Sequence, residues 1–239
     1  EPNGRKITVA LIQGGITSDW YGRINSAEEI LDVYERLSLE SSRVKPDIII
    51  WPEFAIMKDI KQDNYFYDRI SNIAKNTNAI LVFGSIEVTD ETDPQFNNIK
   101  NITHVFNRDG SYLGGYIAVL PFVFNGRIVN GQEFTVFNTD VGKFGITSCE
   151  EETYGFIDKI YTKDGADFLI NVSNDEPIKN MYIRKIKSMH SQFSASENNR
   201  YLIRSTNTGF TEVINPFGKI EAEISPNKEG YLTADIYVK

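Results

Sequence analysis

Short runs of β-branched and other apolar residues alternate with segments of helical periodicity along this chain, and that alternation most narrows the folds open to it. Residues 7–12 and 47–51 are apolar runs of strand length. Between them, residues 26–43 open with the capping-box spacing Ser26-Ala27-Glu28-Glu29 and continue with apolar side chains at helical spacing. Strand and helix patterns that alternate in this way predict an α/β fold.

The rest of the chain combines further helices with hairpins. Strands are predicted at residues 80–86, 103–106, 111–116, 134–138, 143–147, 167–172, 201–205, 212–215, 219–223 and 231–238, and helices at residues 65–77, 153–163 and 180–199. An Asp109-Gly110 turn predicts that two of these strands form a hairpin. We therefore expect a mixed sheet, or two sheets, with helices outside. Because no linker-like segment interrupts the pattern, we expect a single domain over residues 1–239.

The composition excludes several classes of protein. The formal net charge of −8 argues against nucleic-acid binding, which needs clustered Lys and Arg. The single cysteine cannot form an internal disulfide, and with two histidines far from it the chain has no metal-ligand spacing. No Gly-rich phosphate loop is present, so we expect neither a metal nor a cofactor. No apolar run approaches the ~18 residues that span a bilayer.

Reactive side chains follow two of the predicted strands. The triplet Cys149-Glu150-Glu151 comes directly after the apolar run at 144–148, and Trp51-Pro52-Glu53 closes the run that begins at Asp47. The carboxyl ends of strands are where side chains converge on a ligand in α/β folds. A thiol and a carboxylate delivered to one such edge are the groups that nucleophilic acyl transfer needs.

Several ordered motifs extend this pattern over residues 7–238. They are Val9-Ala10-Leu11-Ile12-Gln13-Gly14, Trp51-Pro52-Glu53, Leu120-Pro121-Phe122, Cys149 with Glu151, Asn171-Val172-Ser173-Asn174-Asp175, and the segment 197–209. In this order and spacing, the chain resembles the carbon–nitrogen hydrolase (nitrilase) superfamily, and within it the catalytic domains of apolipoprotein N-acyltransferases. The resemblance implies a four-layer α-β-β-α sandwich, with mixed sheets and helices outside, and a Glu-Lys-Cys catalytic set.

Carried over by this resemblance, Glu53 is the general base and Cys149 the nucleophile, but the lysine of the set is missing. Its position, five residues before Pro121, is occupied by Tyr116. A free thiol is mostly protonated near neutral pH, so a base must take its proton as it attacks a carbonyl. The oxyanion that forms then needs positive charge or aligned donors, and Tyr116 offers one neutral hydrogen bond.

The sequence also bears on a second family glutamate, on the missing cation and on the residues around the pocket. A family glutamate expected shortly after the Pro-Phe pair is absent, since Val123 and Phe124 stand there. The candidate replacements for the missing cation are Lys100, Arg127 and Lys143. Glu151 is interpreted as a carboxylate that orients other groups, with a role as a base the alternative. Residues in two turn-forming segments are expected to shape the pocket without acting as catalysts: Asn174, Asp175 and Asn207.

Two classes of function fit these residues. The first is a thiol-dependent acyltransferase or amidase that passes through a Cys149 thioester. Its acyltransferase form would take an acyl group from a phospholipid, transfer it to the N-terminal amine of a lipoprotein and face outward from the cytoplasmic membrane, held there by transmembrane segments outside residues 1–239. A small-molecule amidase would instead be cytoplasmic. The second class is a catalytically weakened binding or assembly domain that keeps the fold. The sequence does not fix the oligomeric state.

Overall fold

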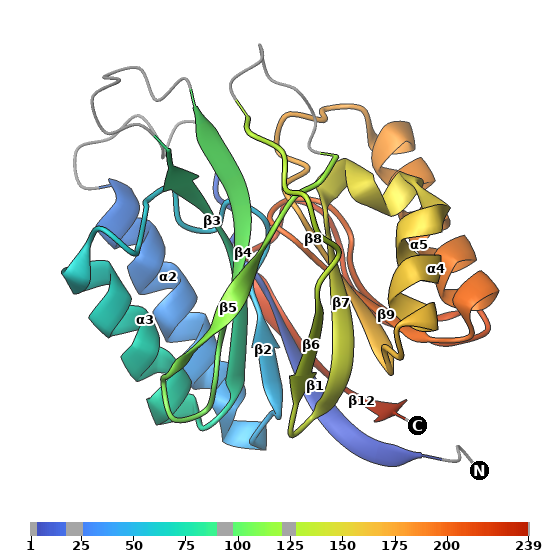
Figure 1. Ribbon diagram of the computed structural model, residues 1–239, viewed down its shortest axis with the longest axis horizontal. Helices are drawn as coiled ribbons and strands as arrows, with labels where there is room; N and C mark the ends of the chain where they lie inside the picture. Colours follow the sequence, from blue (N-terminus) through green and yellow to red (C-terminus); the bar gives the residue numbers. More distant parts are fainter. Residues whose placement is uncertain (1–3, 18–25, 90–97, 121–127, 239) are drawn as a thin grey trace.

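Two six-stranded sheets face each other in this protein, and helices cover their outer faces (Figure 1). The computed structural model describes residues 4–17, 26–89, 98–120 and 128–238. One sheet has the strand order β12-β1-β2-β3-β4-β5, and the other has the order β11-β10-β9-β8-β7-β6. This is the four-layer α-β-β-α sandwich that the family resemblance implied, with helices outside mixed sheets.

The first sheet and its helices come mainly from the N-terminal half of the chain. Its strands are β1 (Arg5–Gln13), β2 (Ile48–Ile50), β3 (Ile80–Val88), β4 (Ile99–Phe106), β5 (Tyr112–Ile117) and β12 (Gly230–Val238). Its helices are α2 (Ser26–Ser41), the short 3-10 helix η1 (Ser42–Val44) and α3 (Asn64–Thr77). The last strand, β12, pairs antiparallel with β1, so the two ends of the chain lie together (Figure 1).

The second sheet contains the C-terminal half. Its strands are β6 (Val136–Thr139), β7 (Gly142–Ser148), β8 (Phe168–Ser173), β9 (Tyr201–Thr206), β10 (Thr211–Ile214) and β11 (Ile220–Ile224). Its helices are the 3-10 helix η2 (Cys149–Thr153), α4 (Gly155–Lys163) and α5 (Met181–Asn198). The strands and helices predicted from the sequence are all found, with small shifts at their ends. The largest shift is in β4, which begins at Ile99.

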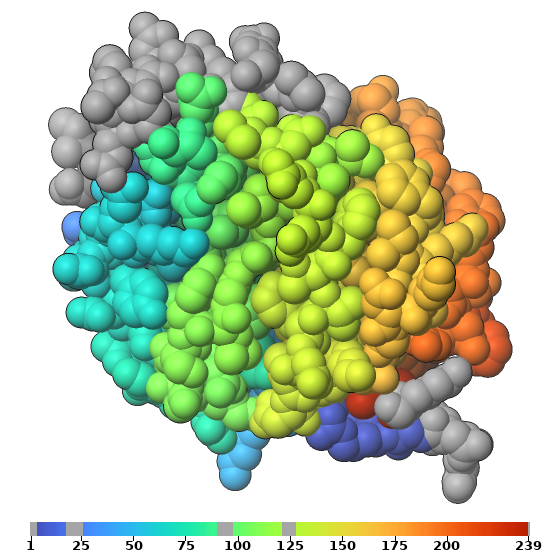
Figure 2. Space-filling view, viewed as in Figure 1, coloured from blue at the N-terminus to red at the C-terminus, as the bar shows by residue number. Residues whose placement is uncertain are grey.

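Each sheet has a parallel centre and antiparallel edges. In the first sheet, β1, β2 and β3 run parallel, and in the second sheet β7, β8 and β9 do the same. Their carboxyl ends therefore open at one edge in each sheet, which is where Glu53 and Cys149 follow β2 and β7. The antiparallel edge strands β5 and β6 lie side by side at the front of the molecule (Figures 1 and 2).

Three apolar clusters hold the layers together. Side chains between the two sheets form the central cluster, which includes Leu11, Ile50 and Ile146. A second cluster joins α2 and α3 to the first sheet, with Trp51 at its middle. A smaller one, around Tyr161 of α4, joins the helices of the second sheet to their strands. None of the helices in the part of the chain described here is both long and apolar enough to cross a bilayer.

Candidate active site

A glycine in β3 sets the position of Glu53. The Gly84 N–H donates to the carbonyl of Pro52 over 3.1 Å, which holds the loop after β2 against β3. A Cβ atom on Gly84 would lie 2.5 Å from the Cα of Glu53 and 2.6 Å from the nitrogen of Phe54. Only a residue without a side chain allows the loop to approach this closely, and the loop directs the Glu53 carboxylate inward between the sheets.

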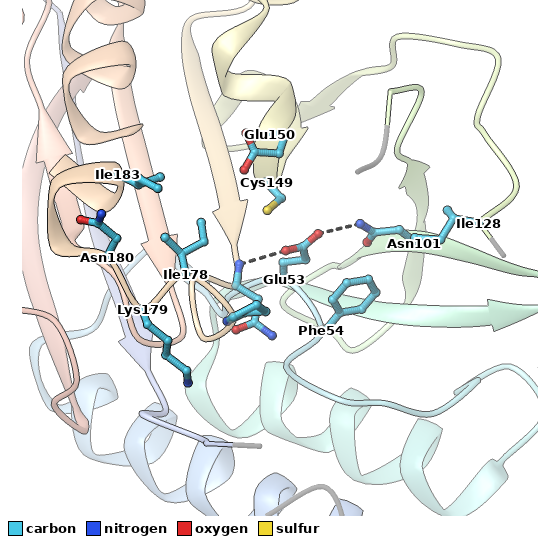
Figure 3. Close-up of a pocket in the computed structure, with 12 residues that line it drawn as sticks. Glu53, Phe54, Asn101, Ile128, Cys149, Glu150, Ile178, Lys179, Asn180 and Ile183 are labelled. Carbon is cyan, nitrogen blue, oxygen red and sulfur yellow. Dashed lines mark hydrogen bonds between the residues drawn. The ribbon is translucent and has the colours of Figure 1, made fainter. Parts of the chain in front are cut away.

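Three groups hold the Glu53 carboxylate, which is 4% exposed. Its Oε1 accepts a hydrogen bond from the Asn101 amide at 2.7 Å and a longer one from the Ser148 hydroxyl at 3.3 Å. Its Oε2 accepts from the backbone N–H of Asn174 at 2.9 Å (Figure 3). Burial raises the pKa of this carboxyl to about 7, although Asn101, Lys187 and the Cys149 thiol each act to lower it. A base that titrates near neutral pH suits proton transfer there.

Cys149 is placed by a sharp turn at the end of β7. Its φ angle of 51° lies in the left-handed region, which is uncommon for a residue with a side chain and is typical of strained functional positions. The turn directs the sulfur toward the Glu53 carboxylate (Figure 3). Burial, and then the charge of Glu53, raise the pKa of the thiol well above its ordinary value, while Lys187 lowers it. The thiol therefore needs its base at the moment it reacts.

Cys149 and Glu53 lie in a pocket of about 540 Å³. Asn101, Glu150 and Asn174 supply further polar groups to its wall. The Oδ1 atom of Asn101 is buried and makes no hydrogen bond with the described residues. Much of the remaining wall is apolar, and it is formed by Phe54, Ile128, Pro177, Ile178 and Ile183. A pocket of this kind binds a largely apolar ligand and orients it through a few polar atoms.

Tyr116 is not brought to the thiol. Its hydroxyl is buried and donates to both carboxylate oxygens of Glu151 at 2.9 Å, and its ring packs in the central cluster and against Tyr161. Glu151 also accepts backbone N–H bonds from Val119, Leu120 and Ser148. The carboxylate thus ties the end of β5 to the start of η2. Tyr116 and Glu151 lie behind the reacting groups and do not line the pocket.

The three loop residues proposed to shape the pocket take different places. Asn174 lines the pocket, and its backbone N–H holds Glu53. The buried Asn207 amide binds Asn174 Oδ1 at 3.1 Å and both backbone groups of Ile16, so that it joins two loops. Asp175 is fully buried behind Cys149. Burial alone would raise its pKa, but Arg204 and Lys187 outweigh that effect and hold the pKa well below its usual range.

Among the described residues, the cation that contacts the thiol was not one of the candidates from the sequence. Lys187 of α5 places its Nζ 3.5 Å from the Cys149 Sγ. Of the earlier candidates, Lys100 pairs with Glu87, and Lys143 lies at the far end of β7 from Cys149. Arg127, together with the Pro121-Phe122 pair, Val123 and Phe124, lies outside the described residues. Lys187 could not be recognised because nothing in the local sequence distinguishes it from the other basic residues of its helix.

No group of three or more His, Cys, Asp or Glu side chains able to hold a metal ion is found within the described ranges.

The chain is similar to known proteins in both sequence and structure. Residues 8–239 match the family model described as "Carbon-nitrogen hydrolase". Apolipoprotein N-acyltransferase from Geobacter metallireducens is 26% identical over 253 residues, covering 98% of this chain and 48% of that protein. Apolipoprotein N-acyltransferase 1 from Treponema pallidum is 28% identical over 228 residues, covering 91% of this chain and 39% of that protein. The chain thus spans about half the length, or less, of these curated relatives.

Solved structures share the fold at low sequence identity. The amidase from Nesterenkonia sp. AN1, solved with an acetamide moiety covalently attached to its active-site cysteine, has a TM-score of 0.79 at 17% identity and covers 99% of this chain and 92% of its own. A carbon–nitrogen hydrolase from Helicobacter pylori has a TM-score of 0.80 at 19% identity, covering 97% of this chain and 89% of its own. These likenesses establish the architecture.

Proposed function

This chain belongs to the carbon–nitrogen hydrolase family, and we propose that it catalyses acyl transfer through a thioester on Cys149, with Glu53 as the general base. One observation carries the proposal most strongly. The only cysteine of the chain lies beside a buried carboxylate in the pocket wall, and its left-handed backbone directs the sulfur toward that carboxylate. The pKa of about 7 for Glu53 allows that carboxylate to accept a proton near neutral pH.

The reaction proceeds in two steps, formation of the thioester and its cleavage. In the first, the thiol proton of Cys149 passes to Glu53 as the sulfur attacks the carbonyl carbon of the acyl donor. A carbon–sulfur bond forms, and the leaving group departs with the proton that Glu53 held. In the second, Glu53 takes a proton from an incoming amine or water, which attacks the thioester carbonyl. The carbon–sulfur bond breaks, and the proton returns to the sulfur.

Two features support an acyl donor with a long apolar chain. The pocket wall contains Ile178 and Ile183, and a long acyl group would bury its methylene groups against them. Ile183 also belongs to an exposed apolar row on α5, with Ile186 at 52% and Phe193 at 65% exposure. Residues three, four or seven apart share one face of a helix, so this row leads to the pocket mouth. An exposed apolar surface of this kind is typical of contact with lipid or another protein.

The finer assignment follows from these features and from the named relatives. The donor is a phospholipid, which the apolar pocket wall and the apolar row on α5 would accommodate. The acceptor is the N-terminal amine of a lipoprotein, as the name apolipoprotein N-acyltransferase suggests for the relatives. The domain would then act at the outer face of the cytoplasmic membrane. A small-molecule amidase differs from this assignment in one testable respect, because it would prefer short acyl groups.

Intact-protein mass spectrometry tests the proposal directly. The protein is incubated with p-nitrophenyl acetate or p-nitrophenyl dodecanoate, and Cys149→Ala serves as the matched control. We expect an acyl adduct on the native chain, faster with the dodecanoyl ester, and none on Cys149→Ala. Faster reaction with the acetyl ester would favour the amidase. An adduct of equal yield on Cys149→Ala, or no adduct on the native chain, would overturn the proposal and favour a binding domain.

A further inference from the structure

Lys187 reaches the sulfur of Cys149 from inside the protein. Its Nζ lies 3.5 Å from the Cys149 Sγ and 3.2 Å from the Ser173 Oγ, and its side chain is 4% exposed. The ammonium group therefore approaches the sulfur on the side away from solvent. A buried ammonium this close to a thiol is an unusual arrangement, because burying a charge is unfavourable unless it is paired.

Three carboxylates surround the ammonium of Lys187. The distances from Nζ are 2.8 Å to Asp175, 3.3 Å to Glu150 and 3.6 Å to Glu152. Burial alone would lower the pKa of Lys187, but Cys149, Glu152 and Asp175 raise it well above its ordinary value, so the group stays charged.

A second buried cation, Arg204, shares two of these three carboxylates. Arg204 pairs with Glu152 at 2.9 Å and with Asp175 at 3.1 Å. Lys187 therefore does not have to neutralise Glu152 and Asp175 alone, and part of its field remains available to the sulfur. The helix that carries it is held firmly, because the Arg184 guanidinium donates to the carbonyls of Ile178, Asp175 and Thr208.

The need for a cation here follows from electrostatics. Glu53 lies next to the thiol, and a carboxylate beside a sulfur disfavours the thiolate. Burial acts in the same direction. Within the described residues, Lys187 is the only side chain with a positive charge for which a contact with Cys149 Sγ is found. The position at which the resemblance predicts a lysine holds Tyr116, whose hydroxyl is bound to Glu151.

We propose that Lys187 is the catalytic cation of this site and pairs with the Cys149 sulfur as its proton moves to Glu53. This inference rests on the proposed acyl-transfer function and adds a residue to it. The positive charge is supplied from helix α5, behind the sulfur, and not from strand β5. No proton leaves Lys187, and its role is to stabilise the negative charge on the sulfur before the carbon–sulfur bond forms and after it breaks.

The thiol can be measured by itself because the chain contains one cysteine. The rate of alkylation by iodoacetamide between pH 6 and 10 reports the thiolate fraction of Cys149. We expect Lys187→Met to slow alkylation at pH 8 by about tenfold or more, which corresponds to a thiol pKa raised by about one unit. Lys187→Arg should retain most of the native rate because it keeps the charge. The exposed Lys185 of the same helix provides a matched control, and Lys185→Met should behave as the native protein does.

A second variant leaves Lys187 untouched, in case its replacement prevents folding. Glu53→Gln removes the opposing charge, so that burial and then Asp175 still raise the pKa of the thiol while Lys187 and the Ser173 hydroxyl lower it. We expect its alkylation profile to show a thiol pKa below about 8.5, the ordinary value, because the ammonium of Lys187 then favours the thiolate without an opposing charge on residue 53. A pKa above that value, or an unchanged profile in a folded Lys187→Met, would overturn the assignment.

These measurements separate the two proposals. Alkylation needs no acyl donor, so it reports the effect of Lys187 even if the native chain forms no acyl adduct. An adduct that forms at the native rate in Lys187→Met would preserve the proposed function and remove Lys187 from it.

Discussion

The two sheets have the same pattern of parallel and antiparallel strands, but α2 and α3 over the first sheet bury mainly apolar side chains, whereas α5 over the second buries mainly polar ones. On the first sheet, α2 and α3 bury Leu31, Tyr34 and Ile70 in an apolar layer. On the second sheet, the buried residues of α5 are almost all polar: Arg184, Lys187, Ser188, Ser191, Ser194, Ala195 and Asn198. Its apolar residues Ile186 and Phe193 face outward.

The apolar layer of the first sheet supports the site, whereas the polar layer of the second sheet supplies charged groups to it. The apolar layer positions Glu53 through the loop after Trp51 but carries no charge of its own. The polar layer lies directly behind Cys149, where Lys187, Arg204, Glu152 and Asp175 form one buried network. Buried charges contribute little net stability even when they are well paired. In the second half of the molecule, α5 therefore buries charged and polar side chains beside the sulfur in place of apolar ones.

The largest expected effect comes from breaking the buried charge network. Arg204→Met leaves Glu152 and Asp175 with one cation instead of two, and we expect it to lower the free energy of unfolding by about 3–5 kcal/mol. Denaturant unfolding followed by circular dichroism measures this. Leu31→Ala in the apolar layer should lower the free energy of unfolding by about 2–5 kcal/mol, because it leaves a cavity, and it should not change the pH dependence of stability. If Arg204→Met were as stable as the native protein, the contrast between the two layers would fail.

A smaller effect should follow from filling the close contact under Glu53. An alanine Cβ at Gly84 would lie 2.5 Å from the Glu53 Cα, so the loop must move. We expect Gly84→Ala to lose about 1–3 kcal/mol of stability and to slow acyl-adduct formation by about tenfold to a hundredfold, because the base is displaced.

Gly145 in the second sheet offers the matched control. A Cβ there would lie 2.1 Å from the Tyr161 ring, so Gly145→Ala should lose comparable stability through overpacking. Its adduct rate, measured in the same mass-spectrometric assay, should change little because Glu53 is not displaced. Equal losses of rate in the two variants would show that general loosening, and not the position of the base, limits the reaction.

The smallest effect is expected at Tyr116. Tyr116→Phe removes one of several hydrogen bonds to Glu151, and we expect a loss of about 1 kcal/mol of unfolding free energy. The adduct rate should stay near the native one, since the hydroxyl is bound to Glu151 and not to the reacting groups. A rate loss of ~10²-fold would instead identify Tyr116 as an oxyanion donor.

Local sequence patterns predict the strands, the helices and the meeting of Glu53 with Cys149, whereas the four layers were implied by the family resemblance, since the patterns alone allowed one mixed sheet or two. Strand and helix periodicity determines the elements, and the carboxyl ends of parallel strands bring the two residues to one edge. The register of β4, which delivers Asn101 to Glu53, depends on pairing over long range. The apolar periodicity of α5 identifies a helix but not its buried face, since Ile183 is 47% exposed while Lys187 is buried. Lys187 was missed for that reason.

The pH dependence of acyl-adduct formation on Cys149 tests the central claim most directly. Burial raises the pKa of Glu53 to about 7, so below that pH the carboxyl is protonated and cannot accept the thiol proton. We predict that the rate of adduct formation falls about tenfold per pH unit below about pH 7 in the native protein, and that in Glu53→Gln this inflection is replaced by one at the pKa of the thiol itself, because the thiol then has no base. The same inflection and rate in both proteins would contradict the role of Glu53 as the base.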